Sequence, residues 1–147
     1  MISNAYEAEL RELLKADLQT GRVREYESST PFFEGLSKAY PLSGSKIDWK
    51  CVPASIQCFD EDASQHVGLF VKFVDDIAKK FSLEGEVVYV GDSATDFALG
   101  GMLEDIRPAL PSIFAIPQHH YLIGPEFSWC LCCTMEGDMA FGRSPAA

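Results

Sequence analysis

The sequence predicts an α+β fold, in which an antiparallel β-sheet is flanked by helices within a single domain covering residues 1–147. Helical patterns dominate the first half of the chain, whereas short apolar runs separated by turn residues dominate its C-terminal end. A chain of 147 residues with 47% apolar residues, including ten Phe, can bury a core without disulfides. No internal repeat or low-complexity linker divides it.

The first predicted helix covers residues 4–20. Asn4 and Glu7 have the spacing of a capping box, and Gly21 ends the helix. Its apolar residues fall on one face at helical spacing. They are Tyr6, Leu10, Leu13, Leu14 and Leu18.

The next forty residues are expected to hold one helix and several short strands. Residues 22–27 alternate and are predicted as a short edge strand or a loop. A helix starts at Thr30–Pro31, because proline suits the first helical position. Residues 41–46 form a turn-rich connection, and strands are predicted at 47–52 and 55–59.

The strongest helical pattern spans residues 63–81, where apolar residues recur at i, i+3, i+4 and i+7. Asp62 or Ser64 can cap its N-terminus. Lys79 and Lys80 suit the negative end of the helix dipole.

The clearest strand covers residues 86–90, which are rich in β-branched side chains. We predict a loop from there through Gly100–Gly101. A short helix then covers 103–114, and Pro108 and Pro111 kink or break it.

The end of the chain is predicted to form an antiparallel meander. Its strands cover residues 119–123, 129–135 and 138–141, joined by turns at Gly124–Pro125 and Glu136–Gly137. Few of the alternating side chains are polar on either face, so both faces of the sheet should be covered.

The charge balance favours a basic partner. The net charge is −10, and between Lys80 and Arg143 nine acids face one basic residue, Arg107. Such a field repels phosphate groups, which argues against nucleic acid and anionic membranes as partners. It attracts a basic protein and steers its approach.

The cysteines and the hydropathy pattern predict a cytoplasmic protein. The N-terminal residues lack the apolar core of a signal peptide, and no apolar run approaches the length of a transmembrane helix. Five cysteines, an odd number, are then most simply reduced thiols.

One segment resembles the metal-binding loop of haloacid-dehalogenase phosphatases, because a strand precedes Gly-Asp-x-x-x-Asp with Asp92 and Asp96. Asp60 opens an Asp-x-Asp sequence like the nucleophile loop of those enzymes. About 30 residues separate the two segments, whereas the phosphatases place several βα units there. A Mg-dependent phosphatase-like enzyme using Asp60, Asp92 and Asp96 is therefore a weak alternative.

A second segment, Gly91-Asp92-Ser93, resembles the nucleophile block of GDSL hydrolases. Those enzymes pair it with a later histidine that has an aspartate three residues before it. Neither His119 nor His120 has such an aspartate, so we expect no catalytic residue at Ser93.

Three cysteines of the predicted meander, with His119 and His120 on the neighbouring strand, could hold a metal or form a Cys–His nucleophile. The cysteines are Cys130, Cys132 and Cys133. Alternation along a strand puts the first two on one face and the third on the other, unlike structural zinc sites. A catalytic thiolate also needs an electropositive setting. We expect buried thiols, with no metal and no cofactor.

Several C-terminal segments are similar to the final block of small bacterial immunity proteins. These segments are Ile116–Tyr121, Ser128–Leu131, Thr134–Asp138 and Phe141–Gly142, and the resemblance covers residues 86–143. Such proteins accompany polymorphic toxins, including those of contact-dependent growth inhibition systems. The resemblance implies an acidic cytoplasmic protein that binds a toxin domain, often a basic nuclease, and it transfers no contact residues.

The expected function is therefore that of a non-enzymatic immunity protein, which neutralises a cognate toxin by occluding its active site. The main alternative is an acidic adaptor or regulatory binding domain. Candidate contacts are the acids expected in loops and at strand ends. They are Asp60, Glu61, Asp62, Asp92, Asp96, Glu104, Asp105, Glu126, Glu136 and Asp138.

Overall fold

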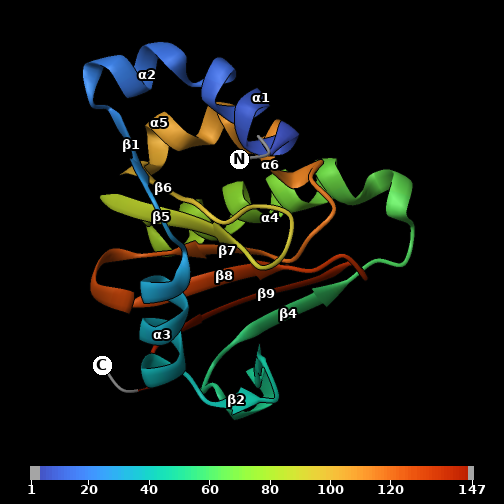
Figure 1. The fold of residues 1–147 in the computed structure, drawn as a ribbon. Coiled ribbons are helices and arrows are strands. Elements are labelled where there is room, and N and C mark those ends of the chain that lie inside the picture. Colours follow the sequence, from blue (N-terminus) through green and yellow to red (C-terminus); the bar gives the residue numbers. More distant parts are fainter. Residues whose placement is uncertain (1–3, 146–147) are drawn as a thin grey trace.

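The computed structural model describes residues 4–145 and has the predicted α+β architecture, a seven-stranded antiparallel sheet flanked by helices (Figure 1). The strand order is β1-β6-β5-β7-β8-β9-β4. The strands are β1 (Val23–Tyr26), β4 (Ile56–Phe59), β5 (Glu86–Gly91), β6 (Ala98–Met102), β7 (His120–Ile123), β8 (Trp129–Cys133) and β9 (Asp138–Arg143). A separate ribbon pairs β2 (Leu42–Ser43) with β3 (Lys46–Ile47).

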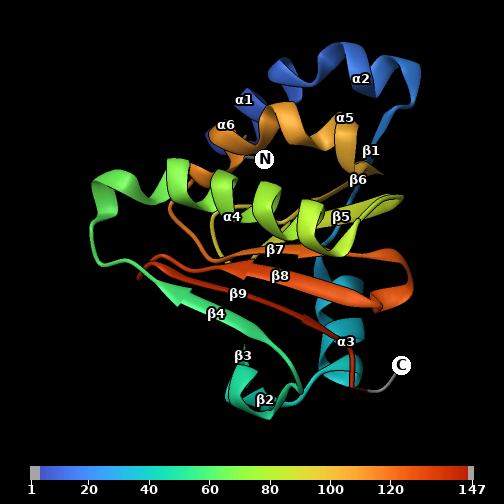
Figure 2. The same cartoon turned by 180° about the vertical axis from the view of Figure 1, so that it is seen from behind.

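Helices cover one face of the sheet, and a helix with the small ribbon covers the other (Figures 1 and 2). The helices are α1 (Ala5–Leu13), α2 (Lys15–Thr20), α3 (Thr30–Ala39), α4 (His66–Phe81), α5 (Leu103–Ile106) and α6 (Leu110–Phe114). Short 3₁₀ turns are η1 (Trp49–Cys51), η2 (Ala63–Gln65), η3 (Arg107–Ala109) and η4 (Pro125–Phe127). Within the described residues, no helix has the length and apolar character needed to cross a bilayer.

The larger core lies between the sheet and helices α1, α4, α5 and α6. Tyr89 and Leu131 of the sheet pack with Leu10 of α1, Phe70 of α4 and Ile113 of α6. Each is 2% exposed or less, and burying such a side chain contributes about 1.5–3 kcal/mol. The predicted helix at 63–81 is thus present as α4, and its apolar i, i+3, i+4 pattern packs against the sheet.

The smaller core lies on the opposite face, under α3 and the β2–β3 ribbon. Val90, Tyr121 and Cys132 of the sheet pack with Leu36 of α3 and with Ile47. Both faces of the sheet are thus covered, as the scarcity of polar residues predicted.

The C-terminal meander has the predicted pairing, with β7 against β8 and β8 against β9. Alternation along β8 puts Leu131 and Cys133 in the larger core and Cys130 and Cys132 in the smaller one. The chain around Pro108 and Pro111 divides into α5, η3 and α6, as expected for a helix broken by proline.

Part of the predicted loop between residue 91 and Gly100–Gly101 is wrong, because β6 runs from Ala98 to Met102 and pairs with both β1 and β5. Gly100 and Gly101 do not form a turn. They allow the neighbouring strand β1 to approach closely. A Cβ on Gly101 would lie 2.6 Å from the carbonyl oxygen of Arg22 on the way into β1.

Two other predictions needed revision. The strand predicted over 47–52 is wrong, because β3 ends at Ile47 and η1 follows it. The first helix divides at Leu14 into α1 and α2, although Gly21 ends it in the left-handed conformation (φ 79°), as expected. The 22–27 segment, left open between strand and loop, contains the edge strand β1.

Candidate partner-binding surface

The register of the sheet brings several acidic segments to one end of it. Gly91 at the end of β5 lies opposite His120, and His120 lies opposite Cys133 at the end of β8. Phe59 at the end of β4 lies opposite Asp138 at the start of β9. The acids that adjoin these strand ends, here called the acidic end, are Asp60, Glu61, Asp62, Asp92, Asp96, Glu136 and Asp138.

The other three candidate contacts lie at the opposite end of the sheet. Glu104 and Asp105 are in α5, directly after β6 ends beside Glu86. Glu126 is in the β7–β8 connection. The structure therefore divides the ten candidate residues into two groups and brings seven of them together.

The β4–α4 connection and the β8–β9 turn are in direct contact. The Asp60 N–H donates to the Gly137 carbonyl oxygen (3.2 Å), and His66 Nε2 bonds the Asp60 carbonyl oxygen (2.8 Å). Gly137 has φ +103°, and a Cβ at this position would collide with the Asp60 carbonyl oxygen. Glycine is thus required at Gly137 by both the turn and the contact.

Asp62 caps the start of the helical segment, as predicted. Its Oδ1 accepts hydrogen bonds from the Ser64 hydroxyl (2.7 Å) and the Ser64 N–H (3.1 Å). These bonds, the hydroxyl first, lower the pKa of the Asp62 carboxyl, so it stays charged at neutral pH.

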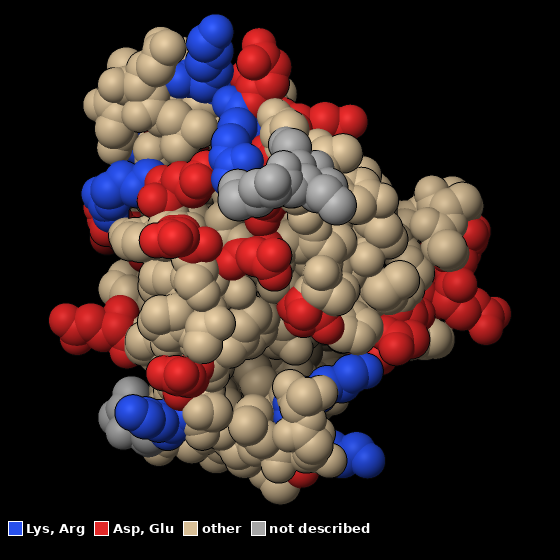
Figure 3. All heavy atoms as spheres, in the orientation of Figure 1, with Lys and Arg blue, Asp and Glu red and all other residues tan. Residues whose placement is uncertain are grey.

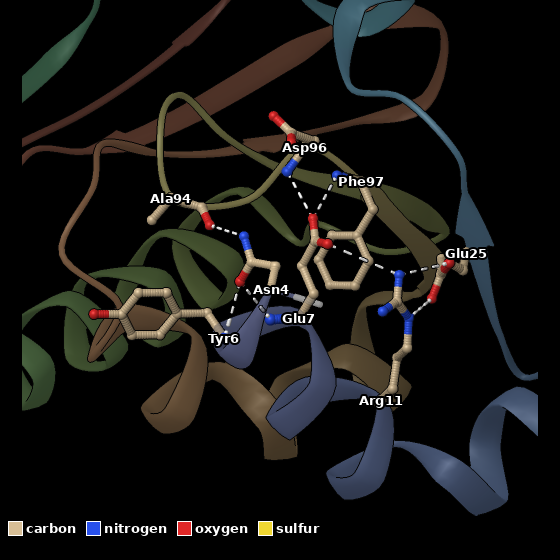
Figure 4. Close-up of polar contacts among 8 residues, drawn as sticks. All are labelled: Asn4, Tyr6, Glu7, Arg11, Glu25, Ala94, Asp96 and Phe97. Carbon is tan, nitrogen blue, oxygen red and sulfur yellow. Dashed lines mark hydrogen bonds and ion pairs between the residues drawn. The ribbon is translucent and has the colours of Figure 1, made fainter. Parts of the chain in front are cut away.

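Side chains from outside the 92–97 loop hold its backbone in place (Figure 4). The Asn4 amide donates to the Ala94 carbonyl oxygen (2.6 Å). The Glu7 carboxylate accepts from the N–H groups of Asp96 (2.7 Å) and Phe97 (3.1 Å). Asn4 caps α1 as predicted, but the capping-box role of Glu7 is wrong because its carboxylate is directed to this loop.

Gln118 fixes the same loop from the other side. Its Oε1 accepts from the N–H groups of Ser93 (3.2 Å), Ala94 (2.8 Å) and Thr95 (3.2 Å). Its Nε2 donates to the Thr95 hydroxyl and to the Tyr89 hydroxyl, both at 3.0 Å. The Gln118 side chain is 1% exposed, so water does not compete for these bonds.

A buried histidine completes this network. The Tyr89 hydroxyl donates to His120 Nδ1 (2.7 Å), and the His120 ring also has a hydrogen bond with the Ile116 backbone. Burial lowers the pKa of His120 to about 4, so the ring is neutral at physiological pH. The network supports the 92–97 loop from inside the protein, where a substrate cannot reach it.

His119 links the 92–97 loop to the β8–β9 turn. Its N–H donates to the Asp92 carboxylate (2.9 Å), and its Nδ1 accepts from the Met135 N–H (3.0 Å). Glu136 Oε2 also lies 3.7 Å from Nδ1. Because the shorter bond uses the Nδ1 lone pair, Glu136 is a neighbour of this nitrogen rather than its hydrogen-bond acceptor.

Most carboxylates of the acidic end lack a cationic partner. Among the described residues, ion pairs reach one of the seven, Glu136, which lies 3.7 Å from Lys46 Nζ and beside His119. In Figure 3 acidic side chains stand out at the edge where the β4–α4 connection lies in Figure 1. Unpaired carboxylates on a fixed scaffold favour a basic ligand.

Two large apolar side chains are exposed among these acids. Phe59, next to Asp60, is 61% exposed, and Met135, next to Glu136, is 53% exposed. Exposed apolar residues rimmed by polar ones are typical of protein-interaction sites. The acidic end thus combines charge with apolar anchors.

Two of the three carboxylates of the phosphatase alternative, those of Asp60 and Asp92, accept hydrogen bonds from nearby groups of the chain. Asp60 Oδ1 accepts from the Asp62 N–H (2.8 Å), and Asp92 Oδ1 accepts from His119 and from the Ser93 hydroxyl. Within residues 4–145, no group of three or more His, Cys, Asp or Glu side chains is placed to hold a metal ion.

The strand cysteines are buried thiols. Cys130, Cys132 and Cys133 are each 4% exposed or less. Burial raises the pKa of Cys132 to about 12 and raises those of the other two well above their usual range. Neutral thiols of this kind are poor nucleophiles and poor metal ligands.

The geometry of the structure is the main guide to function, because comparison with known sequences gives no further information. No protein-family model matches the chain, and a search of curated proteins finds no similar sequence.

Sequence reasoning did not identify Phe59 and Met135 as exposed anchors, nor Glu7 and Gln118 as supports of the acidic loop. Phe59 and Met135 lie in strand-like runs, where apolar side chains are usually buried. Gln118 has no local pattern around it, because its partners lie 23 to 29 residues away.

Proposed function

We propose that this chain is an immunity protein, which binds a basic toxin domain through the acidic end of the sheet and thereby covers the toxin's active site. The observation that carries this proposal is that seven carboxylates lie at the end of the sheet that also exposes Phe59 and Met135. Six of these carboxylates are outside the ion pairs of the described residues. The resemblance expected from the sequence of residues 86–143 agrees with this function, although no protein-family model matches the chain.

The proposed mode of inhibition is electrostatic mimicry. A nuclease binds a polyanion in a positive cleft, so carboxylates exposed on an inhibitor's surface would compete for the same basic groups. The charges would accelerate association, and Phe59 and Met135 would supply desolvated contacts in the centre of the interface. The hydrogen bonds that Gln118 and Glu7 accept from the 92–97 loop favour binding, because the loop is ordered before the partner arrives.

A growth-protection assay tests this proposal. The toxin domain encoded beside this gene is expressed with and without the chain, and the affinity of the purified pair is measured by calorimetry. We expect protection and a complex with a Kd in the nanomolar range or below. A toxin domain that neither binds nor loses activity would refute the immunity function.

An acidic adaptor remains the second candidate, because the same surface suits any basic protein. It predicts a complex with a basic partner that has no toxic activity. Binding without growth protection would favour this alternative.

A further inference from the structure

The two edges of the sheet differ in their protection. On β1, Arg24 pairs with Glu86 (2.6 Å) and Glu25 pairs with Arg11 (2.7 Å), so this edge is charged. On β4 the four residues from Ile56 to Phe59 carry no charge and include no proline. Charges and prolines are the usual means by which edge strands avoid pairing, so β4 is an unguarded edge.

The backbone of β4 has free positions on its outer side. The Asp60 N–H donates inward to Gly137 of the β8–β9 turn. Because bonded and outward-facing residues alternate in an antiparallel pair, Cys58 also faces β9, whereas Gln57 and Phe59 direct their backbone groups outward. No other strand of the described chain pairs with this side.

A hollow adjoins β4 on each face of the sheet. On the α4 side, a groove of about 250 Å³ is lined by the apolar residues Phe59, Leu69, Phe73 and Met139, together with Cys58 and the charged residues Asp60, Lys72 and Asp76. On the opposite side, a cavity of about 180 Å³ is lined by Trp49, Ile47, Tyr121 and Cys132, among others. An added strand would lie about 4.8 Å from β4 and direct alternate side chains to the two faces, toward these hollows.

We propose that β4 accepts an extended strand of the basic toxin domain as an eighth strand of the sheet. This inference rests on the proposed function and names the form in which the partner binds. Main-chain bonds at Gln57 and Phe59 would give affinity, and the two hollows would select apolar side chains at alternate positions. The acids that follow β4 would pair with basic residues of that strand.

Charge complementarity selects this occupant over a second copy of the chain. Pairing two β4 strands would bring together two molecules that each carry a net charge of −10. The Asp60–Asp62 run directly continues the edge, and its carboxylates lie outside the ion pairs of residues 4–145. A basic strand removes this repulsion, whereas self-association adds to it.

Amide hydrogen exchange on the full ¹⁵N-labelled chain tests the proposal with two probes. One probe is the toxin domain encoded beside the gene, and the other is an end-blocked octapeptide with four Val in its centre and two Lys at each end, so that both faces of an added strand carry Val. We expect each to slow exchange at Gln57 and Phe59 at least tenfold. Cys58 and Asp60, which already bond to the β9 side, should change less.

Two variants separate backbone pairing from side-chain contact. Gln57→Pro deletes an outward N–H at an edge position that tolerates proline, and Gln57→Ala keeps that N–H. The proline variant should bind each probe at least tenfold more weakly, and the alanine variant within threefold of wild type. The exchange measurement uses wild-type protein, so it decides the matter even if the proline variant does not fold.

The outcomes distinguish this inference from the proposed function. Toxin binding without protection of Gln57 and Phe59 refutes strand addition and leaves the immunity function standing. Protection by the peptide with no toxin binding refutes the immunity function and leaves β4 as an acceptor of basic strands. If neither probe binds, both strand addition and the immunity function are refuted. If Gln57 and Phe59 are protected without either probe, in samples where the protein self-associates, the β4 edge belongs to an interface with a second copy.

Discussion

Replacing Gln118 by Leu should destabilise the protein more than any surface substitution of the same kind. The change keeps a similar side-chain volume and removes both hydrogen-bonding atoms. Gln118 Oε1 accepts three backbone N–H groups of the 93–95 segment, and Nε2 donates to Tyr89 and Thr95. In the variant these five groups lose their partner at once.

The expected loss follows from the burial of those groups. A buried donor left without an acceptor costs about 1–3 kcal/mol. The Thr95 N–H is buried, whereas those of Ser93 and Ala94 are partly buried and can recruit water. Counting about 1 kcal/mol, the lower limit of the range, for each of these three N–H groups gives a loss of about 3 kcal/mol in unfolding free energy. For a chain of this size that corresponds to a fall in Tm of about 10 °C.

Urea unfolding and calorimetry measure this loss. The matched control is Gln19→Leu, because Gln19 is an exposed residue of α2 and surface substitutions usually change stability by less than about 0.5 kcal/mol. If the two variants differ by less than about 1 kcal/mol, the buried network is not what holds the 92–97 loop.

Three further results are expected. His120 has a folded pKa of about 4 against an unfolded value of 6.5, so it contributes stability above pH 6.5 that is lost as the pH falls through about 4. In urea titrations, the acid-induced fall in unfolding free energy should therefore be smaller by about 3 kcal/mol in His120→Gln than in wild type. A thiol reagent should label Cys51 and Cys58 in the native protein and all five cysteines in denaturant, since the other three are buried; rapid native labelling of all five would contradict the buried cores. Gly137→Ala should lower the unfolding free energy by at least about 1 kcal/mol, because φ is +103° and the new Cβ meets the Asp60 carbonyl oxygen; an unchanged Tm would show that the turn can rearrange.

The sequence predicted elements whose apolar periodicity agrees with their final burial. The α4 pattern, the β5 run and the meander of β7, β8 and β9 are of this kind. β6 was missed because two glycines in five residues suggest a loop, although they are there to let β1 approach. The strand predicted after residue 46 failed because a 3₁₀ turn places Trp49 against the smaller core.

The candidate surface was only partly predictable. The acids were assigned to loops and strand ends from the scarcity of charges within the strands, and seven of the ten lie together in the fold. Their meeting depends on strand order, which local patterns do not specify. Glu7 was interpreted as part of a helix cap because its true partners, Asp96 and Phe97, lie 89 and 90 residues away.

The most direct test of the acidic end compares two triple variants with equal loss of charge. One carries Asp60→Asn, Glu61→Gln and Asp96→Asn at the acidic end, and the other carries Glu104→Gln, Asp105→Asn and Glu126→Gln at the opposite end of the sheet. Association with the toxin domain encoded beside the gene is followed by stopped flow at low salt. The account predicts that the first variant associates roughly tenfold more slowly, whereas the second stays within twofold of wild type. Equal slowing of both variants would show that net charge alone attracts the partner, and slowing confined to the second would place the binding surface at the other end.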